Sequence, residues 1–161
     1  MSEQYGEQLL VHFLKKPAEK LFGSQQWPHH VTLLSWFAIP ETRQDELNDE
    51  LSIIARRTEP IAIKTEGEDM FGRKHNQRVR LIGAESLKAI HNRLANVVEH
   101  TLKGVIRDTE FRGRKYQPHI TEQGHIMVPA DKELRIDSFS LVQKGDMPAD
   151  LEIINTYRFE G

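Results

Sequence analysis

The chain has 161 residues, of which 38% are hydrophobic and 29% are charged, and its formal net charge at pH 7 is -2. This length allows one domain with a hydrophobic core of its own, so we expect a single domain over residues 1–161. The nearly balanced charge excludes the broad cationic surface of a non-specific nucleic-acid binder. The absence of cysteine excludes disulfides, thiolate nucleophiles and cysteine-based zinc sites, and it is typical of a reducing compartment.

The beginning of the chain, MSEQYGEQ, is acidic and polar, unlike the basic and then apolar start of a secretory signal. No apolar run approaches the roughly 20 residues that a membrane-spanning helix needs. We therefore expect a cytoplasmic protein with no membrane partner.

The first half of the chain predicts two strands and then a helix. Residues 7–14 and 29–39 read as strands, the second of which is longer. Thr42 is placed to cap a helix that should end before Pro60. The apolar residues of this helix recur on one face and are Leu47, Leu51, Ile54 and Ala55.

The middle of the chain repeats this order. Residues 61–65 and 78–83 read as strands on either side of a polar stretch that is a loop or a hairpin end, and Ser86 is placed to cap a second helix. A basic connector follows at 107–115.

Three more strands are expected at 116–123, 133–143 and 151–159. The order of elements favours an α+β domain with helices outside and sheets inside, and it resembles a rough duplication.

One short motif occurs in both halves: His30-Val31-Thr32 and His119-Ile120-Thr121. Composition alone gives about 0.25 triplets of His, an apolar residue and Ser or Thr, so a pair is unexpected. In a strand, residues i and i+2 point to the same side, so each His shares a face with its Thr. If the two halves pack with these faces together, two imidazoles and two hydroxyls converge in one cleft.

Two opposed histidines suit phosphodiester chemistry without a metal. A neutral imidazole removes a proton from the attacking oxygen, and a protonated one delivers a proton to the leaving oxygen. Threonine hydroxyls can donate to the non-bridging phosphate oxygens. Since the chain has neither cysteine nor closely spaced histidine pairs of the zinc-binding type, we expect no metal and no cofactor.

With these motifs the chain resembles the 2H phosphoesterase superfamily, in particular its 2'-5' RNA ligase and cyclic phosphodiesterase-like branch. The resemblance covers a leading strand, the first motif, a helix, the stretch MFGRKHNQRVRLIG, a second helix, YQPHIT and two closing strands. It implies a bilobed fold with pseudo-twofold symmetry, in which two antiparallel-rich sheets face a central cleft and the helices lie outside. It also implies that His30 and His119 are catalytic and that Thr32 and Thr121 contact the phosphate.

The second motif departs from the family pattern at its fourth position, where Glu122 replaces the usual apolar residue. The strand is therefore expected to end or to reach solvent there. His29 has the opposite strand parity to His30, so a surface role is favoured for it over a substrate contact.

Four further residues are candidate substrate contacts: Trp36, Phe71, Arg114 and Tyr116. Trp36 shares the parity of His30 if the strand is undisturbed, and an indole or a phenyl ring there could stack on a base. Arg114 and Tyr116 precede the second motif and could reach a phosphate. For Trp36 ordinary packing is favoured over stacking, and for the basic loop the two roles are evenly balanced.

The motifs predict a metal-independent phosphodiesterase that acts on a cyclic phosphate or a 2'-5' linkage of a nucleotide or RNA end, with reversible 2'-5' ligation as a further activity. The alternative is a binding module that holds a nucleotide or RNA end in the same cleft without turnover. A third reading is a coincidence of two core triplets, which requires the imidazoles to lie far apart. We expect a monomer whose partner is the nucleotide or the terminal phosphate.

Overall fold

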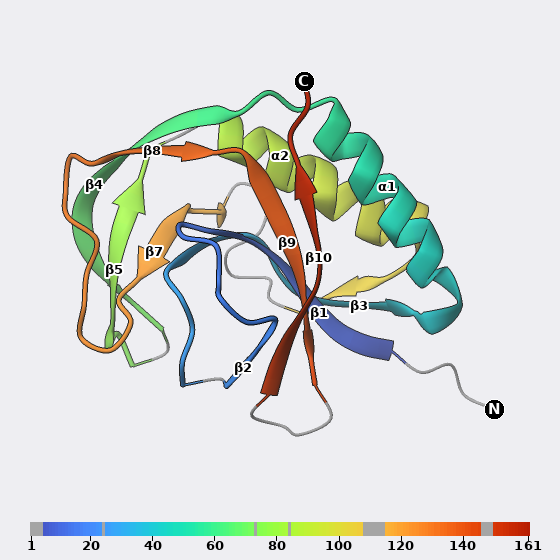
Figure 1. Ribbon diagram of the computed structural model, residues 1–161, viewed down its shortest axis with the longest axis horizontal. Helices are drawn as coiled ribbons and strands as arrows, with labels where there is room; N and C mark the ends of the chain where they lie inside the picture. Colours follow the sequence, from blue (N-terminus) through green and yellow to red (C-terminus); the bar gives the residue numbers. More distant parts are fainter. Residues whose placement is uncertain (1–4, 24, 73, 84, 108–114, 146–149) are drawn as a thin grey trace.

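The computed structural model describes residues 5–23, 25–72, 74–83, 85–107, 115–145 and 150–161 (Figure 1). Its elements, in chain order, are β1 (Tyr5–Phe13), β2 (Leu21–Gly23), β3 (His30–Pro40), the 3₁₀ turn η1 (Glu41–Arg43), α1 (Gln44–Arg56), β4 (Ile61–Phe71), β5 (Gln77–Ile82), α2 (Glu85–Asn96), the π-helical turn η2 (Val97–Thr101), β6 (Val105–Ile106), β7 (His119–Thr121), β8 (Glu133–Ile136), β9 (Ser138–Lys144) and β10 (Asp150–Arg158). The predicted α+β class is confirmed. None of the helices in the described ranges has the length and apolar character needed to cross a membrane.

The strands form a curled antiparallel sheet in the order β2-β10-β9-β1-β3-β7-β5-β4-β8, and β6 pairs with β3. The two expected sheets are thus joined where β3 meets β7, which are the two strands that carry the repeated motif. Figure 1 shows β4, β5, β7 and β8 on one side of this junction and β9 and β10 on the other. The motifs therefore lie side by side at the middle of one sheet.

Apolar residues cover both faces of the sheet around β1. Leu10 belongs to the larger core, which α1 and α2 cover with residues such as Leu51 and Leu94 (Figure 1). Its neighbours Leu9 and Val11 point to the other face and belong to a second cluster, because successive residues of a strand alternate between faces. The second cluster consists of Leu9, Val11, Phe13, Val142, Leu151 and Ile153, with Phe22, Trp27 and Trp36 packed against it.

Strand β4 extends to Phe71, six residues beyond its predicted end, so the stretch expected to be a loop or a hairpin end belongs to the β4–β5 hairpin. Residues 66–70 are exposed, which explains their polar sequence. Cross-strand pairing holds this hairpin together: Glu68 lies opposite Arg80 and forms a two-bond ion pair with Arg78, at 3.1 and 3.2 Å.

The predicted strand at 116–123 is much shorter, and β7 spans only His119–Thr121. The predicted strand at 133–143 is divided into β8 and β9 at Asp137. The short strands β2 and β6 have no clear alternation and were not predicted.

Both predicted helix caps are wrong. Thr42 lies inside the 3₁₀ turn η1, and α1 begins after Arg43 without a side-chain capping bond. Helix α2 already includes Glu85, so Ser86 is a residue of its first turn.

Candidate active site

The repeated motifs meet at one antiparallel residue pair, in which Val31 of β3 lies opposite Ile120 of β7. A local twofold axis through this pair relates His30 to His119 and Thr32 to Thr121. Both residues of the central pair point into the helix-covered core, with exposures of 0%. The two histidines and two threonines consequently lie on the opposite face, which carries the second cluster.

The same hydrogen bond holds both imidazoles. The Nδ1 atom of His30 lies 2.8 Å from the Pro28 carbonyl oxygen, and Nδ1 of His119 lies 2.8 Å from that of Gln117. Each carbonyl belongs to the residue two positions before its histidine and accepts a proton from Nδ1. In the neutral ring, Nε2 then carries no proton and is the basic nitrogen. It can therefore accept a proton on this face of the sheet.

His30 is packed among aromatic rings of the second cluster. Its ring centroid lies 4.5 Å from that of Trp27, with the planes 35° apart, and 6.2 Å from that of Phe13. Burial lowers the pKa of His30 from its ordinary 6.5 to about 4; the bond to the Pro28 carbonyl opposes this, and the charges of His119 and His29 lower the pKa further. His30 is therefore neutral at pH 7.

His119 lies against the Phe71 ring in its own half. The edge of that ring meets the imidazole at a centroid distance of 4.7 Å and an angle of 76°. Burial also lowers the pKa of His119, and the bond to the Gln117 carbonyl opposes the change. Because Val31 of β3 pairs with Ile120 of β7, His30 and His119 lie on neighbouring strands and on the same face of the sheet, each one residue from this pair. This proximity argues against the reading of two unrelated core triplets.

The two threonines lie beside the imidazoles on neighbouring strands. The pairing of Val31 with Ile120 places Thr32 opposite His119, and Thr121 opposite His30. Both threonine side chains are partly buried. Each hydroxyl can therefore donate to an oxygen atom that lies between the two imidazoles.

The other predicted contacts differ in their placement. Phe71 lies at the site, at the end of β4. Trp36 packs against the second cluster, and the Nζ atom of Lys144 lies 5.2 Å from the centroid of the indole ring. The described contacts of Trp36 are therefore packing contacts at the edge of this cluster. Arg114 lies outside the described residues.

Tyr116 has a different position from the one expected of a substrate contact. It is only 5% exposed and belongs to the helix-covered core. Its hydroxyl donates to the Thr32 carbonyl oxygen at 2.7 Å. The basic residues that precede Tyr116 suggest a phosphate contact. This prediction is wrong, because the aromatic ring lies on the helix-covered side of β3.

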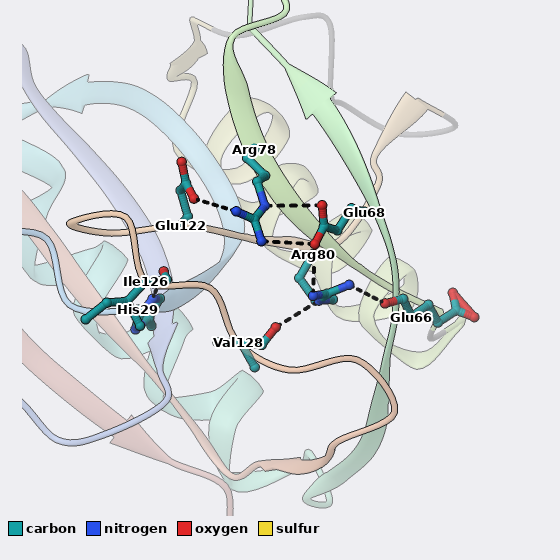
Figure 2. A network of polar contacts seen from close by, with 8 residues as sticks. All are labelled: His29, Glu66, Glu68, Arg78, Arg80, Glu122, Ile126 and Val128. Atoms are coloured by element: carbon teal, nitrogen blue, oxygen red, sulfur yellow. Dashed lines mark hydrogen bonds and ion pairs between the residues drawn. The ribbon is translucent and has the colours of Figure 1, made fainter.

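Glu122 completes an ion-pair network with Arg78 and Glu68, as Figure 2 shows. Its carboxylate lies 3.5 Å from a guanidinium nitrogen of Arg78, and the backbone N–H of Glu122 donates to the Arg78 carbonyl oxygen. The expectation that the strand ends at this position is confirmed, since β7 ends at Thr121.

Arg80 anchors the same network from within the protein and is 8% exposed. Its guanidinium donates to the carbonyl oxygens of Val128 and Glu66, at 2.8 and 3.1 Å, and to the carboxylate of Glu68 at 3.3 Å (Figure 2). The network therefore connects β4, β5 and the segments that follow β7.

His29 takes the surface role that its parity indicates. Its Nε2 atom bonds to the Ile126 carbonyl oxygen at 2.9 Å, in the tight turn after the second motif (Figure 2). The bond connects the start of β3 with the segment that follows β7.

Two residues near the site were missed. Trp27 packs against His30 with the two rings tilted, and the only sequence signal was an aromatic residue three positions before the motif. His91 of α2 is buried with its Nδ1 atom 2.7 Å from the Leu33 carbonyl oxygen, and it appears in the sequence only as a polar residue between apolar positions of a helix.

Within the described ranges, no group of three or more His, Asp or Glu side chains is arranged to hold a metal ion. The expectation of a metal-free reaction stays a prediction.

The family model of the 2'-5' RNA ligase superfamily matches residues 11–152. The chain belongs to this superfamily. The match spans both motifs, and it confirms the resemblance to the 2H phosphoesterases.

This chain is also similar to the RNA 2',3'-cyclic phosphodiesterase of Bacillus subtilis strain 168, with 32% identity over 108 residues. This match covers 64% of the chain and 57% of the Bacillus protein.

Solved structures share the fold. The Thermus thermophilus protein TT0787 has a TM-score of 0.65 at 14% identity, covering 96% of this chain and 98% of the other. LigT of Escherichia coli, solved with 3'-AMP, has a TM-score of 0.62 at 14% identity, covering 98% and 100%. The curled antiparallel sheet with two helices is therefore the fold that these structures share with this chain.

Proposed function

We propose that the chain is a metal-independent phosphodiesterase that opens a cyclic phosphate or cleaves a 2'-5' linkage in a nucleotide or at an RNA end. The proposal rests on the twofold-related His–Thr pairs, whose imidazoles are both held through Nδ1 on one face of the sheet. The name of the Bacillus subtilis relative supports the cyclic phosphate as substrate. Ligation of a 2'-5' bond is the reverse of a cleavage in which the neighbouring 3'-hydroxyl attacks phosphorus, a cyclic phosphate forms, and the bond to the 5'-oxygen breaks to release a 5'-hydroxyl.

In the proposed hydrolysis, one imidazole accepts a proton from water as the water oxygen forms a bond to phosphorus. The bond between phosphorus and one ribose oxygen breaks, and the other imidazole, initially protonated, gives its proton to that oxygen. The product is a phosphate monoester. The hydroxyls of Thr32 and Thr121 donate to the non-bridging oxygens, where charge redistributes in the transition state.

We assign the base to His30 and the acid to His119 in the hydrolytic direction. His30 packs against Trp27 and Phe13, and its pKa of about 4 keeps it neutral over most of the pH range. The charge of a protonated His119 is among the causes that lower the pKa of His30, so we place the single proton of the pair on His119.

The test uses purified protein in excess EDTA with a panel of 2',3'-cyclic nucleotides, RNA ends with a cyclic phosphate, and 2'-5' dinucleotides. We expect turnover of at least one substrate class, and a loss of about 10²- to 10⁴-fold in His30→Gln and His119→Gln. His29→Gln is the matched control and should retain activity, because this side chain bonds to Ile126 in the surface turn.

The alternative is a binding module. It would bind the same ligands without turnover, and both histidine variants would then change only the affinity. Activity that EDTA abolishes and added metal restores would contradict the metal-free mechanism.

Three accompanying expectations stay predictions: a single domain over residues 1–161, a monomer, and a cytoplasmic location. Sedimentation analysis of the purified chain tests the monomer directly.

A further inference from the structure

Two stacked aromatic rings lie behind the first motif, on the helix-covered side of β3. The rings of Tyr116 and His91 are 4.1 Å apart at their centroids, with the planes 5° apart. Both side chains are buried, with exposures of 5% and 2%. The phenol hydroxyl donates to the Thr32 carbonyl oxygen, and Nδ1 of His91 donates to that of Leu33, each at 2.7 Å. The stacked pair thus holds two consecutive carbonyl groups of the motif strand.

An irregularity in β3 explains why these carbonyls bond to side chains. Consecutive residues of β1 pair with Thr32 and Leu34, so Leu33 is an additional, bulged residue. On its other edge, β3 pairs with β7 at Val31 and with β6 from Phe37 onward. The two rings lie along the stretch between these pairings. Because a buried carbonyl without a hydrogen bond is costly, the rings take the place of a neighbouring strand.

We propose that Tyr116 and His91 are positioning residues that fix β3 at the point where it presents His30 and Thr32 to the substrate. This inference rests on the proposed function. Tyr116 bonds to the backbone of the residue whose hydroxyl contacts the phosphate, and it lies three positions before His119. The pair therefore connects α2 and both motifs, and a change at the phenol alters the placement of one imidazole relative to the other.

The decisive variant is Tyr116→Phe, which keeps the aromatic stack and removes one hydrogen bond. Tyr157→Phe is the matched control: Tyr157 is 6% exposed, and its hydroxyl donates to Asn48 of α1, in a different part of the core. For both variants, kcat and KM for a 2',3'-cyclic nucleotide, the His30 titration by NMR, and the thermal midpoint are measured. A misplacement of catalytic groups affects kcat, whereas a purely structural role affects only the midpoint.

We expect Tyr116→Phe to lower kcat about tenfold or more, with KM within about twofold of the wild type. The His30 titration should also shift. Tyr157→Phe should lose thermal stability with kcat and the titration unchanged. In the double variant His91→Leu, Tyr116→Phe, kcat should be only slightly lower than in the less active of the two single variants, because the two rings act as a unit.

The proposal is wrong if Tyr116→Phe keeps kcat within about twofold of the wild type and leaves the His30 titration unchanged, whatever happens to the thermal midpoint. If the wild type turns over no substrate of the panel, the proposed function fails. The positioning role is then judged on the titration of His30, which should shift in Tyr116→Phe and stay constant in Tyr157→Phe.

Discussion

The low pKa of His30 depends on the aromatic rings around it, and Trp27 is the residue whose removal tests this dependence. Burial is the largest cause of the decrease from 6.5 to about 4, which corresponds to about 3 kcal/mol. The indole covers one side of the imidazole at 4.5 Å, whereas Phe13 contacts it at 6.2 Å and remains in place. We therefore expect Trp27→Leu to remove a little under half of the effect and to raise the His30 pKa by about one pH unit, or about 1.4 kcal/mol.

The assay is the pH dependence of kcat/KM for a 2',3'-cyclic nucleotide, combined with an NMR titration of the histidine rings. In the wild type, kcat/KM should rise as His30 loses its proton near pH 4 and should fall as His119 loses its proton below pH 6.5. Trp27→Leu should move only the acidic limb, toward pH 5 by roughly one unit.

Trp36→Leu is the matched control, because it removes an indole of the same cluster whose described ring contact is with Lys144. It should leave both limbs in place. The reasoning is refuted if Trp27→Leu leaves the acidic limb and the His30 titration where they are in the wild type, or if Trp36→Leu moves them equally.

Three further predictions concern pH and stability. His30 binds a proton less readily in the folded than in the unfolded chain, so the unfolding free energy should fall as the pH decreases from about 6.5 to about 4. In urea titrations, His30→Gln should reduce this fall by about 2 kcal/mol. An unchanged fall would contradict the assignment. Phe71→Leu should move the alkaline limb of kcat/KM to higher pH by a few tenths of a unit, because it exposes His119, whereas a change in KM alone would identify Phe71 as a substrate contact only. Arg80→Leu should destabilise the fold by about 2 to 4 kcal/mol because the buried carbonyl group of Val128 and the partly buried one of Glu66 lose their donor, while Arg78→Leu, at a side chain 41% exposed, should cost less than about 1 kcal/mol; equal effects would refute the distinction.

The motif could be predicted from the sequence because its geometry is local. Residues i and i+2 of a strand share a face, so the relation of His30 to Thr32 required no knowledge of the tertiary fold. The meeting of the two motifs is a long-range pairing of Val31 with Ile120, and the sequence indicated it only through the repetition itself. The motifs are neighbours in one curled sheet, whereas the resemblance implies that they face one another across two.

The role of Tyr116 could not be predicted, because its position behind β3 depends on a bulge. The sequence does not reveal that Leu33 is the extra residue of a bulge, because Val31, Leu33 and Leu34 are all apolar and buried. The bulge leaves the Thr32 carbonyl group to be satisfied by a side-chain donor. The hydroxyl of Tyr116 is this donor, and its ring lies in the core. A tyrosine beside basic residues carries no sequence signal of that kind.

The extent of β4 was missed for a related reason. Residues 66–70 are exposed, and their strand structure is stabilised by pairing with β5 and by the contacts of Glu68 with Arg78 and Arg80. The apolar alternation that identifies a strand is absent there, because this part of the hairpin covers no core.

The central claim is that His30 and His119 act together as base and acid on one phosphate. The direct measurement is kcat for a 2',3'-cyclic nucleotide, in excess EDTA, for His30→Gln, for His119→Gln and for the double variant. The account predicts that each single variant loses about 10²- to 10⁴-fold and that the double variant is hardly slower than the slower single one, because each proton transfer depends on the other. Full activity in either single variant, or losses that multiply in the double variant, would contradict it.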